Sequence, residues 1–396
     1  MPSELSRILS NGKGGAKNRK LSCAIHVLAW PAAMSSKLVW PKRRTVISEN
    51  PSRILLIRVD GIGDLVMVIG AIWALRQQHP GAKIDLLTSD AASTIANLLV
   101  DAKYIDRVYV LPLLKRTRAL QREMATTLRA QNYDVAFDLR GDMRNILIAW
   151  LANIPRRVGP AGTALSYLLT DRVIIPKGTH QLHECNQLFA TLGSPEAFAV
   201  DAKQQTQLPL RTGDLDEAKK WLEQNGQQPG KPLVAIHPSA FVPSKVWPLE
   251  RFVEVAKRLL QNGDCQVVVV GGKAELDSAR QFAEQVKPFE VIVATGQTSL
   301  LTTAAILARC AVMIGNDSGP AHLAASVGAT PVVMFACVNV ERYHPVTDKL
   351  VVLRPASPCD PKCDRTCATP DRHCMLEYTP DRVVELAKKA MDATAK

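Results

Sequence analysis

Short apolar runs alternate regularly with amphipathic stretches from Arg53 to the end of the chain. The first repeat has an apolar run over residues 53–59, a glycine turn over residues 60–63 and a helical period over residues 64–78. Strands that alternate with helices in this way form parallel sheets covered by helices on both faces. We therefore predict an α/β fold built from parallel sheets.

The alternation occurs twice, which predicts two domains. Residues 194–213 lack periodicity and are rich in Pro, Gln, Asp and Thr, so we interpret them as the linker. A chain of 396 residues is also too long for one typical domain. The expected strands cover residues 53–59, 83–88, 107–111, 134–138, 233–236, 266–270, 290–294, 311–314 and 331–335, with turns and short strands over residues 155–176. The expected helices cover residues 64–78, a stretch from 91, and residues 118–131, 144–151, 182–192, 215–224, 248–261 and 380–393.

This organisation predicts two Rossmann-like domains whose parallel sheets face a central cleft, because open parallel sheets bind ligands at the carboxyl ends of their strands. We divide the chain into an arm at residues 1–50, domains at 51–205 and 206–379, and a last helix at 380–396.

The net charge of +12 is unevenly distributed, since the first 50 residues hold nine basic and two acidic residues. No basic stripe is interleaved with aromatic residues, so we expect no nucleic-acid partner. An apolar run over residues 21–34 is too short to span a bilayer. We interpret it as part of a basic, poorly structured arm; contact with an anionic membrane surface and a cleaved export signal are the alternatives.

A turn over residues 315–319 follows a short apolar strand and precedes Pro320, which suits a first helical position. Ser318 and Gly319 then lie where backbone N–H groups gather to bind an anionic oxygen, and Asp317 and His322 flank them. The alternative is an ordinary strand-to-helix turn. The chemistry therefore favours an anion site here without requiring one.

Two further loops in the second half end strands at the same expected edge. The loop after residue 236 offers Ser239 and Lys245, and Lys245 is a suitable counter-charge for a diphosphate or simply a solvated lysine. Glu275 follows the next strand, where an acid accepts ribose hydroxyls or caps a helix. Together these loops predict a nucleotide-diphosphate site.

In the first half, Asp64 begins the first helix and is either a catalytic acid or base or an N-terminal cap. The glycine turn before it lacks the third glycine of the dinucleotide fingerprint, where Val66 stands, so an oxidoreductase is disfavoured. The triplet 214–216 starts a helix, which disfavours the Asp-x-Asp site of metal-dependent transferases.

These motifs together resemble glycosyltransferase family 9, the ADP-heptose:lipopolysaccharide heptosyltransferases of GT-B fold. The resemblance runs from about Arg53 to the last helix. Four sequence stretches support it: Arg58-x-Asp-x-Ile-Gly-Asp64, His237-Pro-Ser with Lys245-x-Trp-Pro, Gly271-Gly272, and Gly315-Asn-Asp-Ser-Gly-Pro-x-His322. It implies an inverting, metal-independent transfer of heptose from ADP-heptose to a lipopolysaccharide inner-core acceptor of lipid A–Kdo type.

By matching positions, the resemblance makes Asp64 the general base and places Ser239, Ala240 and Lys245 at the diphosphate, with Lys245 also catalytic. It places Asp317, Ser318, Gly319 and His322 at the phosphates and the sugar. Arg58 stands where the family commonly has Lys, and Ala240 replaces a hydroxyl residue. We add Glu275 to the donor side. We expect Arg58, Arg140, Arg144 and Arg157 on the acceptor side, where arginines bind phosphates.

Four cysteines near the C-terminus, Cys359, Cys363, Cys367 and Cys374, form a candidate structural metal site, although their spacing departs from that of common zinc ribbons. The alternative is reduced or bridged thiols. No cofactor is expected for catalysis. Other function classes that stay open are a transferase or epimerase acting on another nucleotide sugar, and a non-catalytic nucleotide-sugar-binding protein. A lipid-linked glycan acceptor predicts a cytoplasmic enzyme, peripheral on the inner face of the inner membrane.

Overall fold

The computed structural model describes residues 50–198, 207–336, 339–356, 367 and 374–394. The chain divides into two compact units, Met1–Asp201 and Ala202–Lys396. Almost the whole of the expected N-terminal arm and part of the expected linker lie outside the described residues. The arm therefore stays a prediction.

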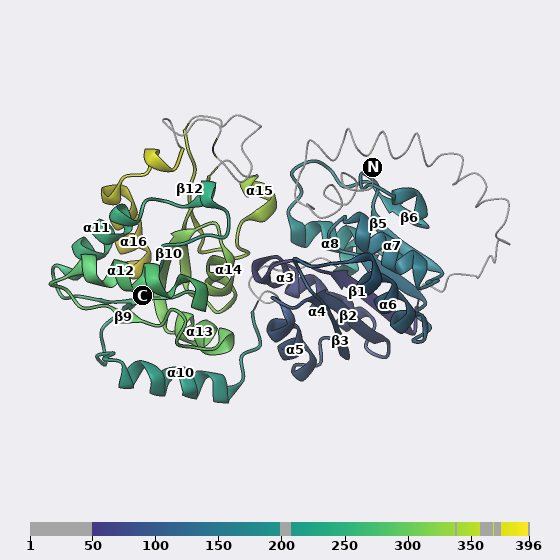
Figure 1. Cartoon of the computed structure of the whole chain (residues 1–396), viewed down its shortest axis with the longest axis horizontal. Coiled ribbons are helices and arrows are strands. Elements are labelled where there is room, and N and C mark those ends of the chain that lie inside the picture. Colours follow the sequence, from purple (N-terminus) through teal and green to yellow (C-terminus); the bar gives the residue numbers. More distant parts are fainter. Residues whose placement is uncertain (1–49, 199–206, 337–338, 357–366, 368–373, 395–396) are drawn as a thin grey trace. The chain divides into compact units, whose positions relative to one another are not determined.

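The first unit contains a six-stranded sheet with the order β3-β2-β1-β4-β5-β6, in which every neighbouring pair is parallel. Helices cover both faces, since α4 packs with α8 and α6 packs with α7 (Figure 1). The strands are β1 (Arg53–Arg58), β2 (Lys83–Ser89), β3 (Arg107–Leu111), β4 (Val135–Asp138), β5 (Arg156–Pro160) and β6 (Asp171–Val173). The helices are α3 (Ile62–Val66), α4 (Ile69–Gln78), α5 (Ser93–Asp101), α6 (Arg118–Arg129), α7 (Met143–Leu151) and α8 (Gln181–Phe189).

The second unit repeats this strand order in a parallel sheet, β12-β11-β10-β7-β8-β9. One helical layer contains α11, α12 and α16, and α13 contacts both α10 and α14 (Figure 1). The strands are β7 (Leu233–His237), β8 (Gln266–Val269), β9 (Ile292–Val293), β10 (Cys310–Asn316), β11 (Thr330–Met334) and β12 (Val351–Leu353). The helices are α10 (Thr212–Gln224), α11 (Leu249–Leu260), α12 (Leu276–Val286), α13 (Leu300–Leu307), α14 (Gly319–Ser326), α15 (Val340–Tyr343) and α16 (Pro380–Thr394).

The central strands are buried on both faces, as parallel strands between two helical layers must be. In β1, Leu55 and Ile57 belong to the core that α6 and α7 cover, and the intervening Ile54 and Leu56 are equally buried. Such strands show no polar alternation in their sequence. This is why a short apolar run was the correct signal for them.

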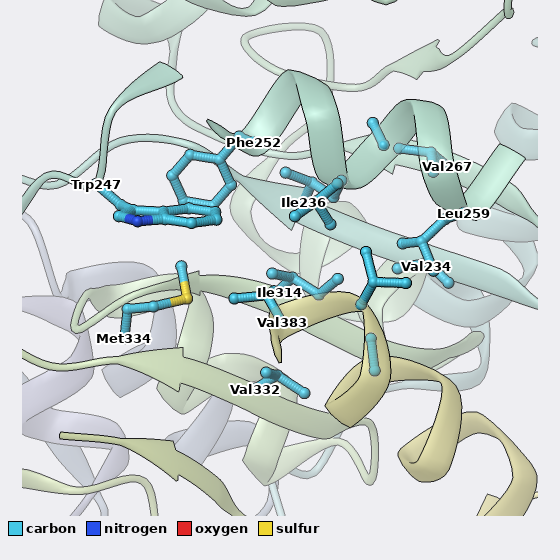
Figure 2. Packing of buried hydrophobic residues seen from close by; sticks show 14 of the residues in the cluster. Val234, Ile236, Trp247, Phe252, Leu259, Val267, Ile314, Val332, Met334 and Val383 are labelled. Carbon is cyan, nitrogen blue, oxygen red and sulfur yellow. The ribbon is translucent and has the colours of Figure 1, made fainter. Parts of the chain in front are cut away.

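The core of the second unit lies between its sheet and the layer of α11, α12 and α16. Figure 2 shows Trp247 beside Phe252, with Ile236, Ile314 and Met334 contributed by three neighbouring strands. The rings of Trp247 and Phe252 meet edge to face at 4.9 Å between centroids. Aromatic pairs of this geometry stabilise a core beyond the area they bury. Trp247 is thereby fixed two residues after Lys245.

The predicted α/β fold of GT-B type, with two Rossmann-like units, is confirmed. Three details differ from the expectation. The helix expected over residues 64–78 is two helices, interrupted at Met67 and Val68, and β12, α12, α13 and α15 were not predicted. The last helix, α16, packs on α11 and β10 of the second unit instead of forming a separate element. Of the helices in the described part of the chain, none has the length and apolar character that crossing a membrane requires.

Candidate functional site

The strand order reverses at one place in each sheet, between β1 and β4 and between β7 and β10. From such a point the connections on either side run to opposite faces, which leaves a crevice at the carboxyl ends of the two strands. Most of the predicted site residues of the first unit end or follow β1 and β4, and most of those of the second follow β7 and β10. The fold therefore collects them at the two positions where a doubly wound sheet binds ligands.

Asn316, the last residue of β10, organises the site of the second unit. Its side chain is fully buried; Oδ1 accepts a hydrogen bond from the Trp247 backbone N–H at 3.0 Å, and Nδ2 donates to the Ser239 carbonyl at 3.1 Å. Both contacts cross to the loop after β7. Asn316 thus fixes the loop on both sides of Lys245. From the sequence, no role had been assigned to Asn316.

Gly315 allows β7 and β10 to approach at this point. A Cβ at this position would lie 2.8 Å from Met313 Cε and 3.1 Å from the His237 carbonyl oxygen. The second distance is the limiting one, because a strand carbonyl cannot rotate away. The glycine that begins the motif is therefore explained by the packing of two strand ends.

Lys245 and Asp317 form an ion pair across the two loops, with 2.5 Å between Nζ and Oδ2. The Lys245 side chain is 24% exposed and the Asp317 side chain 6%. Lys245 lies in a short 3-10 turn, Pro243–Lys245, that precedes the buried Trp247. The pair places a partly accessible ammonium beside the start of α14.

His237 connects Ser318 to Glu275. Its Nδ1 lies 3.1 Å from Ser318 Oγ and its Nε2 lies 3.1 Å from Glu275 Oε1. Glu275 Oε2 also accepts a hydrogen bond from the Gly272 N–H at 2.7 Å. Burial acts to raise the pKa of the Glu275 carboxyl, but the contacts with His237 and the Gly272 N–H lower this pKa overall. Glu275 therefore lies in the same cluster as the loop at Ser318, as an anchored carboxylate.

Ser318 is the N-cap of α14, and its Oγ lies 3.1 Å from the Asn316 carbonyl oxygen. Gly319 and Pro320 begin the helix, so its first N–H groups and the positive end of its dipole point out of this loop. His322 lies in the first turn, buried, and its Nδ1 has no hydrogen-bond partner. Burial lowers the pKa of His322 to about 4, so this imidazole is neutral at about pH 7.

In the first unit, Arg58 at the end of β1 lies beneath Asp64 of α3. Arg58 is 1% exposed; Nη1 donates to the Leu139 carbonyl at 2.5 Å, and Nη2 lies 3.9 Å from Asp64 Oδ1. Arg58 Nε and Nη2 have no hydrogen-bond partner. A buried guanidinium thus lies at ion-pair distance from a partly exposed carboxylate.

Asp60 lies between Asp64 and Arg140, a position that the sequence did not assign to it. Asp60 Oδ2 is 3.2 Å from Arg140 Nε, and Arg140 Nη1 donates to the Val59 carbonyl at 2.9 Å. The Gly61 N–H lies within hydrogen-bond distance of both Asp60 Oδ1 and Asp64 Oδ2. Two carboxylates and two arginines are thus gathered at the carboxyl ends of β1 and β4.

Asp142 forms ion pairs with two further arginines at this edge of the sheet, Arg144 and Arg116. Its carboxylate binds Arg144 through two hydrogen bonds to Oδ2 and Oδ1 and contacts Arg116 at 3.2 Å. Burial opposes ionisation, but Arg144, Arg116 and Arg140 together lower the pKa of Asp142 to about 2. Arg144, expected to bind the acceptor, is therefore already paired with a carboxylate.

Arg157 does not join the cluster. Its position in β5 is paired with Ala136, two residues before β4 ends. Its guanidinium donates to the carbonyls of Ile154, which precedes β5, and Leu168. The side chain thus lies near the amino edge of the sheet, and the acceptor-binding role expected for Arg157 stays a prediction.

The cysteine cluster is only partly described. Cys359 and Cys363 lie outside the described residues, whereas Cys374 is buried in the second core and Cys367 is half-buried. Within the described ranges, no group of three or more His, Cys, Asp or Glu side chains is arranged to bind a metal ion. The remaining predicted residue, Ala240, lies in the loop after β7 and is half-buried.

Comparison with known proteins connects this geometry to one family. Residues 121–373 match the sequence model of glycosyltransferase family 9 (heptosyltransferase). The chain is 26% identical to lipopolysaccharide heptosyltransferase 2 of Salmonella typhimurium, over 84% of this chain and 97% of that protein. It is 25% identical to lipooligosaccharide heptosyltransferase 2 of Haemophilus ducreyi, with the same shares covered.

Solved structures share the fold. A glycosyl transferase family 9 protein from Veillonella parvula superposes with a TM-score of 0.76 at 21% identity, covering 86% of this chain and 98% of that one. The ADP-heptose heptosyltransferase II of E. coli superposes with a TM-score of 0.69 at 21% identity, covering 87% and 100%. At these identities the likeness concerns the fold.

Proposed function

The chain belongs to glycosyltransferase family 9, and from that membership we propose that it is an inverting heptosyltransferase. In this proposal it moves a heptose from ADP-heptose to a lipopolysaccharide inner-core acceptor of lipid A–Kdo type. The observation that supports it most is the placement of complementary groups at the two switch points: a partly exposed acid, Asp64, follows β1, and a partly exposed cation, Lys245, follows β7. An inverting displacement requires both.

Asp64 takes the proton of the acceptor hydroxyl in this proposal. Its side chain is 29% exposed, so an incoming hydroxyl has access to it, and the buried Arg58 lies 3.9 Å from its carboxylate. As the proton leaves, the acceptor oxygen bonds to the anomeric carbon of the heptose. The bond from that carbon to the diphosphate breaks, and ADP leaves with the electron pair.

The second unit stabilises the departing diphosphate. Lys245 supplies a positive charge, and the first turn of α14 with Ser318 and Gly319 supplies N–H donors. The neutral His322 adds polar contacts without a further charge. Asp317 sets the position of the Lys245 ammonium. Glu275, which His237 holds in place, accepts hydrogen bonds from hydroxyl groups of the donor sugar nucleotide. Charge neutralisation by these groups requires no catalytic metal.

Arg58 and Arg140 are proposed on the acceptor side, with Arg144 contributing through its remaining donors. A lipid-linked acceptor also implies work at a membrane surface, and we propose a peripheral position on the cytoplasmic face of the inner membrane. Co-sedimentation with vesicles that contain anionic lipids tests this point. Recovery of all the protein in the supernatant at low salt would contradict it.

A structural metal at Cys359, Cys363, Cys367 and Cys374 stays a prediction. Elemental analysis of the purified protein decides it. A stoichiometric metal that is lost in a variant with all four residues changed to Ser would support the site, and an absence of metal from protein purified without chelators would refute it.

The catalytic proposal is tested by Asp64→Ala. We expect loss of transfer while ADP still binds, because the donor groups lie in the other unit. Binding is measured by calorimetry and transfer by mass spectrometry of the acceptor. Full transfer activity in this variant would refute Asp64 as the base.

A further inference from the structure

We propose that Asp60 forms a proton-sharing carboxyl pair with Asp64 and thereby acts as a positioning residue for the base of the reaction. The inference rests on the proposed function for the role of Asp64. It concerns a residue that lies four positions before Asp64 and two after Arg58, the last residue of β1. From the sequence, Asp60 had no role beyond the turn.

One backbone N–H joins the two acids. The Gly61 N–H is 3.0 Å from Asp60 Oδ1 and 3.2 Å from Asp64 Oδ2. Both carboxyl groups therefore face the same donor, which brings an oxygen of one acid close to an oxygen of the other. Since ionised carboxylates only accept hydrogen bonds, a contact between them is favourable when a proton lies between them. The geometry is therefore that of a pair which holds one proton well.

Each acid also has a cation of its own. Arg140 Nε lies 3.2 Å from Asp60 Oδ2, and Arg58 Nη2 lies 3.9 Å from Asp64 Oδ1. This arrangement fixes the two carboxyl groups from opposite ends. Asp60 is only 6% exposed, whereas the Asp64 side chain is 29% exposed. Asp64 is consequently the member that an acceptor reaches, and Asp60 acts through it.

The charged groups that face Asp60 lie on several elements, and they have opposing effects on its pKa. Arg58 of β1, Arg140 after β4 and Arg116 before α6 favour its charge, and Asp64 of α3 opposes it. Ser89 at the end of β2 binds the Asp60 carbonyl and not its carboxyl. Burial and then the charge of Asp64 raise the pKa of Asp60 to about 6 despite the arginines.

The pair improves Asp64 in two ways. Before the reaction, the pair takes up a proton more readily than an isolated acid would, because two nearby carboxylates resist being charged together. During the reaction, the acceptor O–H bond breaks and its proton passes to Asp64, where the Asp60 carboxylate accepts a hydrogen bond from it. The acceptor oxygen bonds to the anomeric carbon and ADP leaves with the electron pair, so atoms and charge balance.

The kinetic test compares pH profiles of kcat/KM for the wild type, Asp60→Asn and Asp60→Glu. For Asp60→Asn we expect the acid limb to move to lower pH by about one unit and the plateau to fall about tenfold, because the remaining base is weaker. Asp60→Glu keeps a carboxyl and should keep a limb close to that of the wild type. Asp90→Asn, an acid directly after β2 that does not contact Asp64, is the matched control and should leave the profile unchanged.

Arg140→Gln provides a test in the opposite direction. Removing the cation beside Asp60 should move the acid limb of kcat to higher pH, measured at saturating acceptor. A purely structural role of Asp60 predicts a lower rate at every pH with the limb in place. If the limb stays in place in both Asp60→Asn and Arg140→Gln, the proposal is refuted.

A titration that needs no substrate separates this proposal from the proposed function. With 13C-labelled aspartate, the Asp60 and Asp64 carboxyl resonances should show two linked titration steps in the wild type, and the remaining acid should show a single step in Asp60→Asn. Unlinked single steps in the wild type would refute the pair. Linked steps in a protein that transfers no heptose would support the pair and refute the heptosyltransferase function.

Discussion

Lys245→Met separates the structural and the electrostatic roles of the ion pair in the second unit. Methionine keeps an unbranched chain of similar length and removes the ammonium. The Asp317 carboxylate, 6% exposed and 2.5 Å from the lost charge, then remains without its cation. The departing diphosphate loses the same charge, so one substitution has two measurable consequences.

The magnitudes follow from the burial of the two side chains. Removing one partner of a fully buried pair costs about 3–5 kcal/mol. Because Lys245 is 24% exposed and water can enter in its place, we expect a loss of about 2 kcal/mol in the free energy of unfolding. Removing one preorganised group that stabilises developing charge lowers kcat by about 100-fold or more.

The double variant Lys245→Met/Asp317→Asn distinguishes the two effects. It removes the unpaired charge and should recover most of the stability in urea denaturation, while kcat for heptose transfer stays low. Lys231→Met is the matched control, since Lys231 is exposed and lies before the amino end of β7. If Lys245→Met retains a kcat close to that of the wild type, or if the double variant regains activity along with stability, the proposed role of Lys245 is incorrect.

Three further substitutions test the cores and the buried titrating groups. Trp247→Ala should destabilise the protein by about 3–5 kcal/mol in urea denaturation, because it empties a fully buried site and removes the edge-to-face contact with Phe252; a cost below about 1 kcal/mol would contradict this packing. Tyr133→Phe should lower the free energy of unfolding by about 2–3 kcal/mol, since it removes the 2.5 Å hydrogen bond to the fully buried Asp85. The double variant Tyr133→Phe/Asp85→Leu should recover part of this loss. Equal instability of the single and the double variant would contradict this reasoning. The folded pKa of His322 is about 4 and lies below its unfolded value of 6.5, so its contribution to the free energy of unfolding is fully present above about pH 7 and falls as pH decreases toward 4. His322→Gln should therefore remove about 2 kcal/mol of the decrease in the free energy of unfolding between pH 7 and pH 5. Identical pH slopes for the wild type and the variant would contradict the buried, neutral imidazole.

The strands and the edge on which the loops gather could be predicted from the sequence, because both depend on short-range patterns. A buried parallel strand is an apolar run bounded by turns, and parallel strands bring their carboxyl ends to one edge. The loops that carry His237, Lys245 and Ser318 meet in the structure, and the roles of these residues stay predictions. That the two switch points are equivalent could be recognised only from the order of the strands in each sheet, and this order is defined by contacts between strands.

The pairings among side chains could not be read from spacing alone. Arg157 looked like Arg140 in the sequence, but the register of β5 against β4 places it near the amino edge. Asp60 appeared to belong only to a turn, because its contact with Arg140 joins residues 80 positions apart. Asn316 was likewise hidden, since it acts on backbone groups of another loop. Such roles depend on tertiary contacts that carry no local signal.

The central claim is most directly tested by a donor panel. Purified protein is incubated with a heptose-free inner-core acceptor and with ADP-heptose, UDP-sugars or GDP-sugars in parallel, and the acceptor mass is measured. We predict an increase by one heptose with ADP-heptose, accompanied by release of ADP, and no increase with the other donors. Transfer from a UDP- or GDP-sugar in preference to ADP-heptose would contradict the account.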